Sequence, residues 1–145
     1  MFRHILVPVG VGPGSLAAAQ HALHLSRWLG CKVTLVHVLE NTEGSVFETF
    51  AQMVQGARRQ PTVLVVEPHS QTIGAVVAEI AQQTHADLIV IGCHDSAQQA
   101  PEGLGPAAQS IVASAKVPVQ VVPAALLAPS KPWLQRFAVG GVQEV

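Results

Sequence analysis

The amino-acid sequence predicts an α/β fold: a doubly wound, five-stranded parallel sheet of flavodoxin-like strand order 3-2-1-4-5, with helices on both faces. Short β-branched runs alternate with longer helical patterns along the 145 residues. The first of these runs, residues 5–9, is apolar throughout, which is typical of a strand that is buried on both faces. Right-handed crossovers between successive strands then place helices on the two faces of the sheet.

Strands and helices are expected to alternate. The strands cover residues 4–9, 32–39, 62–66, 87–92 and 117–122. The first helix, residues 16–29, has Ser15 as its N-cap and Gly30 as its C-terminal stop. The second helix is opened by a capping box of Ser45 and Glu48 and extends to about residue 59. The third helix covers residues 72–84, and the fourth runs from Pro106, at its first position, to about residue 115.

The chain divides into one α/β domain, residues 1–123, and a C-terminal tail, residues 124–145. The domain has an ordinary size for a single hydrophobic core. The tail has apolar side chains that need cover from elsewhere: Trp133, Leu134, Phe137 and Val139. Two placements stay open, because the tail can cross onto a partner subunit or pack on helices of its own chain.

Charge is scarce in this sequence. Asp, Glu, Lys and Arg make up 12% of the residues, and the net charge is −1. No basic run is longer than Arg58-Arg59, which argues against partners such as nucleic acid or an anionic membrane. No apolar stretch reaches the ~18–20 residues of a membrane span. The N-terminus does not resemble a signal peptide, and Cys31 and Cys93 lie far apart, so we expect a cytoplasmic protein.

Two glycine-containing loops fall where such a sheet binds ligands. In open parallel sheets, ligands bind beyond the carboxyl ends of the strands, where the strand order reverses. For the order 3-2-1-4-5 this point lies between the first and fourth strands, which are followed by the loops of residues 10–14 and 92–105. The glycines of the first loop have a second interpretation, since a tight strand-to-helix turn also requires them.

Residues 2–123 resemble the universal stress protein domain. The resemblance rests on residues 5–9 (Ile-Leu-Val-Pro-Val) with a turn ending in Ser15-Leu16, on Val36-His37-Val38, on residues 86–94 (Ala-Asp-Leu-Ile-Val-Ile-Gly-Cys-His), and on residues 117–122. It implies the 3-2-1-4-5 sheet, a cytoplasmic role in stress response, and a homodimer that forms by pairing of the last strands. Residues 117–122 independently favour that pairing, because Gln120 is their only polar side chain and Pro118 alone opposes it.

One branch of that family binds ATP through Gly-x-x-Gly, nine residues, and Gly-Ser/Thr after the fourth strand, with Asp-Gly-Ser after the first. In this chain Gly92 and Gly105 match, but Asp95 replaces the second Gly and Pro106 replaces the Ser/Thr. Residues 10–12 read Gly-Val-Gly in place of Asp-Gly-Ser. The candidate crevice, with its occupancy in doubt, is assigned to Pro8, Val9, Gly10, Val38, Gly92, His94 and Gly105.

The altered positions oppose phosphate binding. Phosphate loops present backbone N–H groups and a hydroxyl near a helix N-terminus, and Pro106 offers neither. Asp95 and Glu102 add negative charge, and each like-charge pair at ~5 Å costs about 3 kcal/mol at an effective dielectric constant of ~20. No Lys or Arg occurs between Arg59 and Lys116 to compensate. Mg²⁺ that bridges Asp95 to a nucleotide is one way to rescue binding.

Two functions therefore remain. The first is a stress-response module that binds no ATP and acts as a homodimer through contacts with an unknown protein partner. The second is a sensor that binds ATP or AMP, together with Mg²⁺, through the altered loop and has at most weak ATPase activity. An enzyme is not favoured and no catalytic residue is assigned, because no nucleophile with an activating partner accompanies His94 and Asp95.

Isolated histidines and cysteines have structural interpretations. His21 and His24 lie three residues apart on one helix without an acidic or Cys neighbour, so we expect them on the surface rather than in a metal site. His37, between two valines, is expected to be a hydrogen-bonded interior histidine. Cys93 is expected to be an inert packing residue.

Overall fold

The computed structural model describes residues 2–10, 12–39, 46–55, 57–93 and 103–123. This part of the chain contains one parallel sheet of five strands: β1 (His4–Pro8), β2 (Lys32–Val38), β3 (Thr62–Val66), β4 (Leu88–Gly92) and β5 (Val119–Val122). The strands follow the order β3-β2-β1-β4-β5 across the sheet. The predicted fold class and strand order are therefore confirmed.

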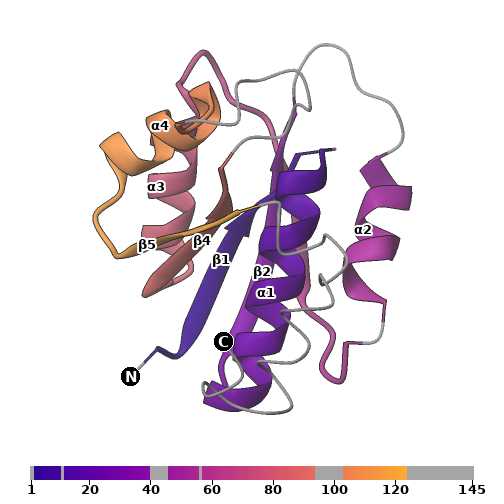
Figure 1. Ribbon diagram of the computed structural model, residues 1–145. Coiled ribbons are helices and arrows are strands. Elements are labelled where there is room, and N and C mark those ends of the chain that lie inside the picture. Colours follow the sequence, from indigo (N-terminus) through magenta and orange to yellow (C-terminus); the bar gives the residue numbers. More distant parts are fainter. Residues whose placement is uncertain (1, 11, 40–45, 56, 94–102, 124–145) are drawn as a thin grey trace, which may run out of the picture.

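Among the described residues, four helices connect the strands: α1 (Pro13–Leu29), α2 (Val46–Val54), α3 (Ile73–Gln83) and α4 (Pro106–Ser114). Helices α1 and α2 cover one face of the sheet, and α3 and α4 cover the other (Figure 1). The chain steps from β1 to β2 to β3 in one direction and then reverses to β4, and right-handed crossovers switch faces at such a reversal. No helix within the described residues is long and apolar enough to cross a membrane.

Helix α1 begins earlier than the sequence predicts. Gly12 is its N-cap and Pro13 occupies its first position, where a fixed φ and a missing N–H are both tolerated. The prediction of Ser15 as the N-cap is therefore wrong. Ser15 lies in the first turn, where its Oγ accepts a hydrogen bond from the Gly10 N–H at 2.7 Å. At the other end Gly30 has the left-handed φ of 66°, which confirms it as the C-terminal stop.

The remaining boundaries differ from prediction mainly at the ends of elements. Helix α2 ends at Val54 rather than near residue 59, and Ser45 of the predicted capping box lies outside the described residues. Thr72 caps α3 by accepting a hydrogen bond from the Ala75 N–H at 3.2 Å. Strand β5 starts two residues later than predicted, after Pro118, which cannot donate to a sheet ladder.

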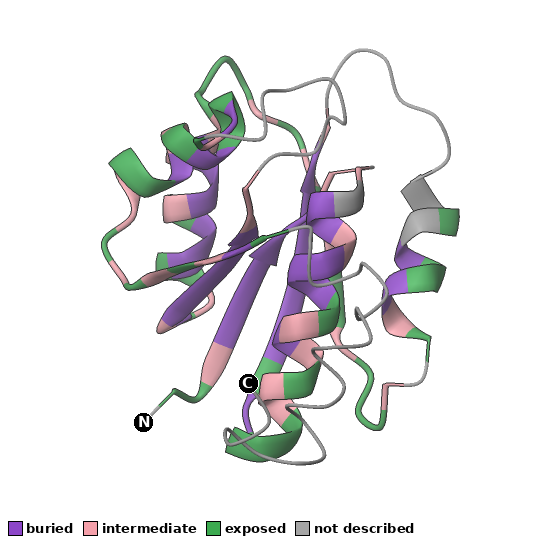
Figure 2. Cartoon of the chain, in the orientation of Figure 1, coloured by how far each residue is buried: buried purple, intermediate pink, exposed green. Residues whose placement is uncertain are grey.

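Each face of the sheet has its own hydrophobic core (Figure 2). On one face, alternate residues of the central strands pack against four alanines of α1: Ile5, Val7, Leu35 and Val90 against Ala17, Ala18, Ala19 and Ala22. On the other face, the intervening residues pack against α3 and α4: Leu6, Val36, Ile89 and Ile91 against Val76, Val77, Ile80 and Ile111. The central strands are thus buried on both sides, as their uninterrupted apolar sequences predict.

Side chains at the amino edge of the sheet tie β1 to its neighbours. The Asp87 carboxylate accepts hydrogen bonds from the backbone N–H of Arg3 at 2.8 Å and of His4 at 3.1 Å. The His4 ring places Nδ1 2.9 Å from the Thr84 carbonyl oxygen and Nε2 2.6 Å from the Thr34 Oγ1. Because a carbonyl oxygen only accepts, Nδ1 of His4 carries a proton and donates it.

The ionisation of Asp87 contributes to stability through these bonds. Desolvation raises the pKa of Asp87, but hydrogen bonds from the backbone N–H groups of Arg3, His4 and Asp87 itself outweigh it, so the pKa lies below 3.8. A depressed carboxyl pKa contributes stability above the pKa of the unfolded chain, and this contribution is lost as the pH falls through the folded value.

We therefore expect Asp87→Asn to unfold more readily than wild type at neutral pH, by about 1 kcal/mol or less because solvent screens the carboxylate. The difference in the free energy of unfolding should shrink as the pH falls from about 7 to about 3, because wild-type Asp87 then becomes protonated. Urea unfolding at a series of pH values measures this difference. A difference that stays constant with pH would show that the charge of Asp87 plays no part.

Candidate functional site

Six of the seven predicted crevice residues lie at the carboxyl edge of the sheet, and His94 lies outside the described residues. The six belong to the ends of three strands and the start of one helix: Pro8, Val9 and Gly10 at β1, Val38 at β2, Gly92 at β4, and Gly105 at α4. Parallel strands end at a common edge, so the topology brings these segments together. Their part in ligand binding stays a prediction.

Internal hydrogen bonds occupy much of the backbone that follows β1. The Val9 N–H donates to the Val36 carbonyl oxygen at 2.8 Å, and the Gly10 N–H donates to the Ser15 hydroxyl at 2.7 Å. The Val9 carbonyl oxygen accepts from Nδ1 of His37 at 2.7 Å. The loop is therefore held in place by its own chain, and the Gly10 N–H is directed at Ser15.

His37 is a second buried polar residue at this edge, beside Ser15. Its side chain is 5% exposed, and its ring meets Phe50 of α2 edge-on, with ring centroids 6.4 Å apart. Because the Val9 carbonyl oxygen only accepts, Nδ1 of His37 carries the proton in this bond. The prediction of a hydrogen-bonded interior histidine is confirmed.

Gly92, the first glycine of the motif, packs directly against the first turn of α1. A Cβ atom at Gly92 would lie 2.5 Å from the carbonyl oxygen of Gly14 and 2.6 Å from its carbonyl carbon. Atoms of backbone cannot move aside as the end of a flexible side chain can. Gly92 therefore has a steric role that requires no ligand, which the sequence did not reveal because Gly14 lies 78 residues away.

The loop after β4 is closed at its base. The Gly105 N–H donates to the Cys93 carbonyl oxygen at 2.7 Å, and Gly105 is the N-cap of α4. Pro106 follows as the first residue of the helix, as the sequence predicts. Helix α4 is itself positioned by α3, since the Gly74 N–H donates to the Ser110 Oγ at 2.9 Å. The start of α4 is thus fixed on two sides.

The described histidines and cysteines away from this edge are not grouped as metal ligands would be. Within the residues that the structure describes, no three His, Cys, Asp or Glu side chains gather closely enough to hold a metal ion. His24 is exposed, as predicted, but His21 is half-buried, so its predicted surface placement is wrong. Burial raises the pKa of the Cys31 thiol, which makes this cysteine unreactive, whereas Cys93 is half-buried.

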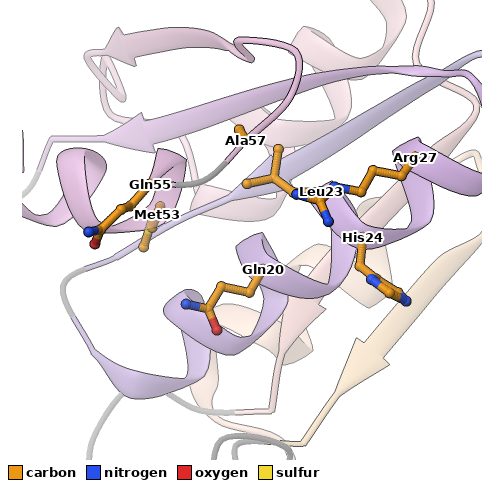
Figure 3. Close-up of a pocket in the computed structure, with 7 residues that line it drawn as sticks. All are labelled: Gln20, Leu23, His24, Arg27, Met53, Gln55 and Ala57. Atoms are coloured by element: carbon orange, nitrogen blue, oxygen red, sulfur yellow. The ribbon is translucent and has the colours of Figure 1, made fainter.

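A shallow cavity of about 190 Å³ lies away from the carboxyl edge, between α1 and the end of α2 (Figure 3). Its lining includes Gln20, Leu23, His24 and Arg27 from α1, with Met53 and Gln55 across from them. These α1 residues lie from the middle of the helix toward its C-terminal end, which runs toward the amino edge of the sheet. The cavity is therefore separate from the predicted crevice.

A doubly wound sheet with two glycine loops at the reversal of strand order defines the class of nucleotide-binding-like α/β domains. Within that class, the model of the universal stress protein family matches residues 1–57 and 47–123. The chain belongs to the universal stress protein family. A search of the curated proteins found no match.

Solved structures of universal stress proteins share this fold. One in complex with cAMP is 16% identical, with a TM-score of 0.67 over 85% of this chain and 98% of that one. The protein UspA from Lactobacillus plantarum is 15% identical, with a TM-score of 0.67 over 83% and 97% of the two chains. A protein from Archaeoglobus fulgidus in complex with dAMP is 17% identical, with a TM-score of 0.62 over 83% and 98%. At these identities the likeness shows the fold alone.

The contact between Gly92 and Gly14 gives a prediction that is independent of any ligand. We expect Gly92→Ala to lower the free energy of unfolding of the ligand-free protein by about 1–3 kcal/mol, because the added methyl group meets backbone atoms. Gly30→Asn is the control, since nothing lies within 4 Å of Gly30 and Asn tolerates its positive φ. Chemical denaturation measures the free energy of unfolding of both variants. Wild-type stability in Gly92→Ala would contradict the steric role.

Proposed function

We propose that this member of the universal stress protein family is a cytoplasmic stress-response module that acts as a homodimer through protein contacts and binds no ATP. The observation that carries the proposal is the start of α4, where Pro106 takes the place of the motif's Ser/Thr. Two parts of the domain bear on this function, namely the phosphate loop and the exposed edge of the sheet.

Hydrogen-bond donors for a phosphate are reduced at the start of α4. A helix N-terminus attracts an anion through the N–H groups of its first turn. Pro106 has no N–H and no hydroxyl, and the Gly105 N–H already donates to the Cys93 carbonyl oxygen at 2.7 Å. An incoming phosphate would therefore lose one donor to proline and compete with a short internal bond for another.

The charges of the loop sequence act in the same direction. Asp95 and Glu102 stand within residues 92–105, and no Lys or Arg occurs between Arg59 and Lys116. A nucleotide phosphate in this loop would meet like charge without a compensating cation from the same segment. The missing donors and the uncompensated negative charge both lower the affinity for ATP that we expect.

An adenine-nucleotide sensor is the second candidate function. The universal stress proteins in complex with cAMP and with dAMP favour it, since both share this fold. In that case the carboxylate of Asp95 would hold Mg²⁺, which prefers carboxylate and phosphate oxygens together. The two candidates differ in whether the wild-type chain has measurable affinity for a nucleotide, and in whether any such affinity requires Mg²⁺ and Asp95.

Thermal unfolding with ATP, AMP and cAMP, each with and without Mg²⁺, separates the two. We expect no dose-dependent rise in the Tm of wild type, whereas a ligand at about a hundred times its Kd adds about 2.7 kcal/mol. The variant Asp95→Gly/Pro106→Ser restores the part of the motif that follows β4. Its Tm should therefore rise with ATP. Asp95→Gly/Pro106→Ala is the matched control, which restores the N–H without the hydroxyl and should gain less. A Mg²⁺-dependent shift of wild type that is lost in Asp95→Asn would establish the sensor instead.

The proposed dimer rests on the outer edge of β5. This strand pairs with β4, and no other strand of the described residues pairs with its outer side. The Ile89 N–H donates to the Pro118 carbonyl oxygen at 2.9 Å, so in parallel pairing the N–H of Gln120 points to β4, and those of Val119 and Val121 point outward. These outward groups can pair with the same strand of a second copy.

The dimer can be tested at one of these outward groups. We expect wild type to sediment as a dimer of a 15.2 kDa chain and Val121→Pro to sediment as a monomer, because proline removes an outward N–H and leaves the bonds to β4 in place. Val121→Ala is the matched control, since it shortens the side chain but keeps the N–H, and it should remain a dimer. Monomeric wild type at micromolar concentration would refute the dimer.

A further inference from the structure

One side of α1 carries three ring side chains, of which those of His24 and Trp28 are exposed and that of His21 is half-buried. We call His21, His24 and Trp28 the α1 flank. Trp28 is 76% exposed, the highest value among the large apolar side chains described, and the next residue, Leu29, is 37% exposed. The Trp28 ring meets only His24 edge-on, with centroids 6.3 Å apart and its Nε1–H donating to His24 Nε2 at 3.2 Å. Such an aromatic surface is usually covered in the assembled protein.

Two residues of the α1 flank, His21 and Trp28, face β5 rather than α2, whereas His24 also borders the cavity between α1 and α2. Helix α1 lies between these two elements (Figure 1). Leu23 contributes to the cavity between α1 and α2 (Figure 3), and at 3.6 residues per turn His21 and Trp28 lie roughly half a turn around the helix from it. On that side of the sheet, Val122 of β5 is buried in the α1 core, whereas Gln120 is exposed.

One polar atom on this side of α1 has no hydrogen-bond partner. Nε2 of His21 is buried and has no hydrogen-bond partner. Buried polar side-chain atoms nearly always have a partner in folded proteins. Because Nε2 of His21 is already buried, a segment that covers this side of α1 has to supply apolar contact to Trp28 rather than a new polar partner for His21.

The chain leaves the sheet beside the start of α1. Val122, the last residue of β5, pairs with Gly92, and Gly92 contacts Gly14 in the first turn of α1. Val122 and Pro123, the last described residues, thus lie near that turn, since Val122 is one strand spacing, ~5 Å, from Gly92. Residues 124–133 reach about 33 Å when extended, whereas Trp28 lies about 21 Å along the helix axis from Gly14. The tail is long enough to bring Trp133 to Trp28.

From these observations we infer that residues 132–139 dock in cis along the α1 flank of their own chain. Trp133, Leu134 and Phe137 have the spacing of one face of a helical turn and cover Trp28. The tether that starts beside α1 gives the segment a high effective concentration there. This favours the chain's own tail over a second copy or an unrelated partner.

The two tryptophans of the chain allow a direct test in the full-length protein. Trp133→Phe leaves Trp28 as the sole fluorophore. In this background we expect weak quenching of Trp28 by acrylamide. Adding Leu134→Asp/Phe137→Asp should raise the quenching constant to that of a free tryptophan derivative. The matched control Gln135→Asp/Gln143→Asp adds the same charge to the tail outside the apolar set and should leave Trp28 protected.

Two outcomes would overturn the inference. Equal quenching of Trp28 with and without Leu134→Asp/Phe137→Asp would show that the segment does not cover the flank. Protection that disappears on dilution, in step with dissociation measured by sedimentation, would assign the covering segment to a second copy. Protection that persists in the monomer supports docking in cis, and thermal unfolding followed by circular dichroism confirms that each variant is folded.

Discussion

The structure depends on how closely α1 approaches β1 and β4. Four alanines, each at most 2% exposed, form the contact surface of the helix: Ala17, Ala18, Ala19 and Ala22. At the end of β4, Gly92 meets the backbone of Gly14 with no space for a Cβ atom. Small side chains allow this close packing, and larger ones would push the helix outward and separate the loops that follow β1 and β4. The same contact therefore builds the core and sets the geometry of the crevice.

This packing gives Gly92 and Gly105 structural roles in a segment whose sequence differs from the ATP motif at Asp95 and Pro106. Gly92 is required by Gly14, and Gly105 caps α4 while its N–H closes the loop on Cys93. The positions that match the motif thus have structural uses in this chain. Pro106 differs from the Ser/Thr of the motif but suits the first position of a helix. What it lacks is the N–H and the hydroxyl that a phosphate would bind.

The sequence predicted the fold well because parallel strands and their helices have strong local patterns. The limits of β3 and the cap Gly30 followed from such patterns. Ser15 was misassigned because Gly12 and Pro13 already start the helix, which frees the Ser15 hydroxyl for Gly10. The site was less predictable, since its decisive contacts, such as that of Gly92 with Gly14, join residues that are distant in sequence and leave no periodic signal.

The two edge strands of the sheet, β3 and β5, differ in the charges that oppose pairing with another chain. Strand β3 carries the exposed side chains of Val63 and Val65, but Arg58 and Arg59 precede it and Glu67 follows it, all of them exposed. Charges at both ends of an edge strand oppose pairing with another chain. Strand β5 has Lys116 before it and no charged residue directly after it. Because only 12% of the residues are charged, their presence at both ends of β3 makes β5 the edge with fewer charges against pairing, which favours the proposed dimer.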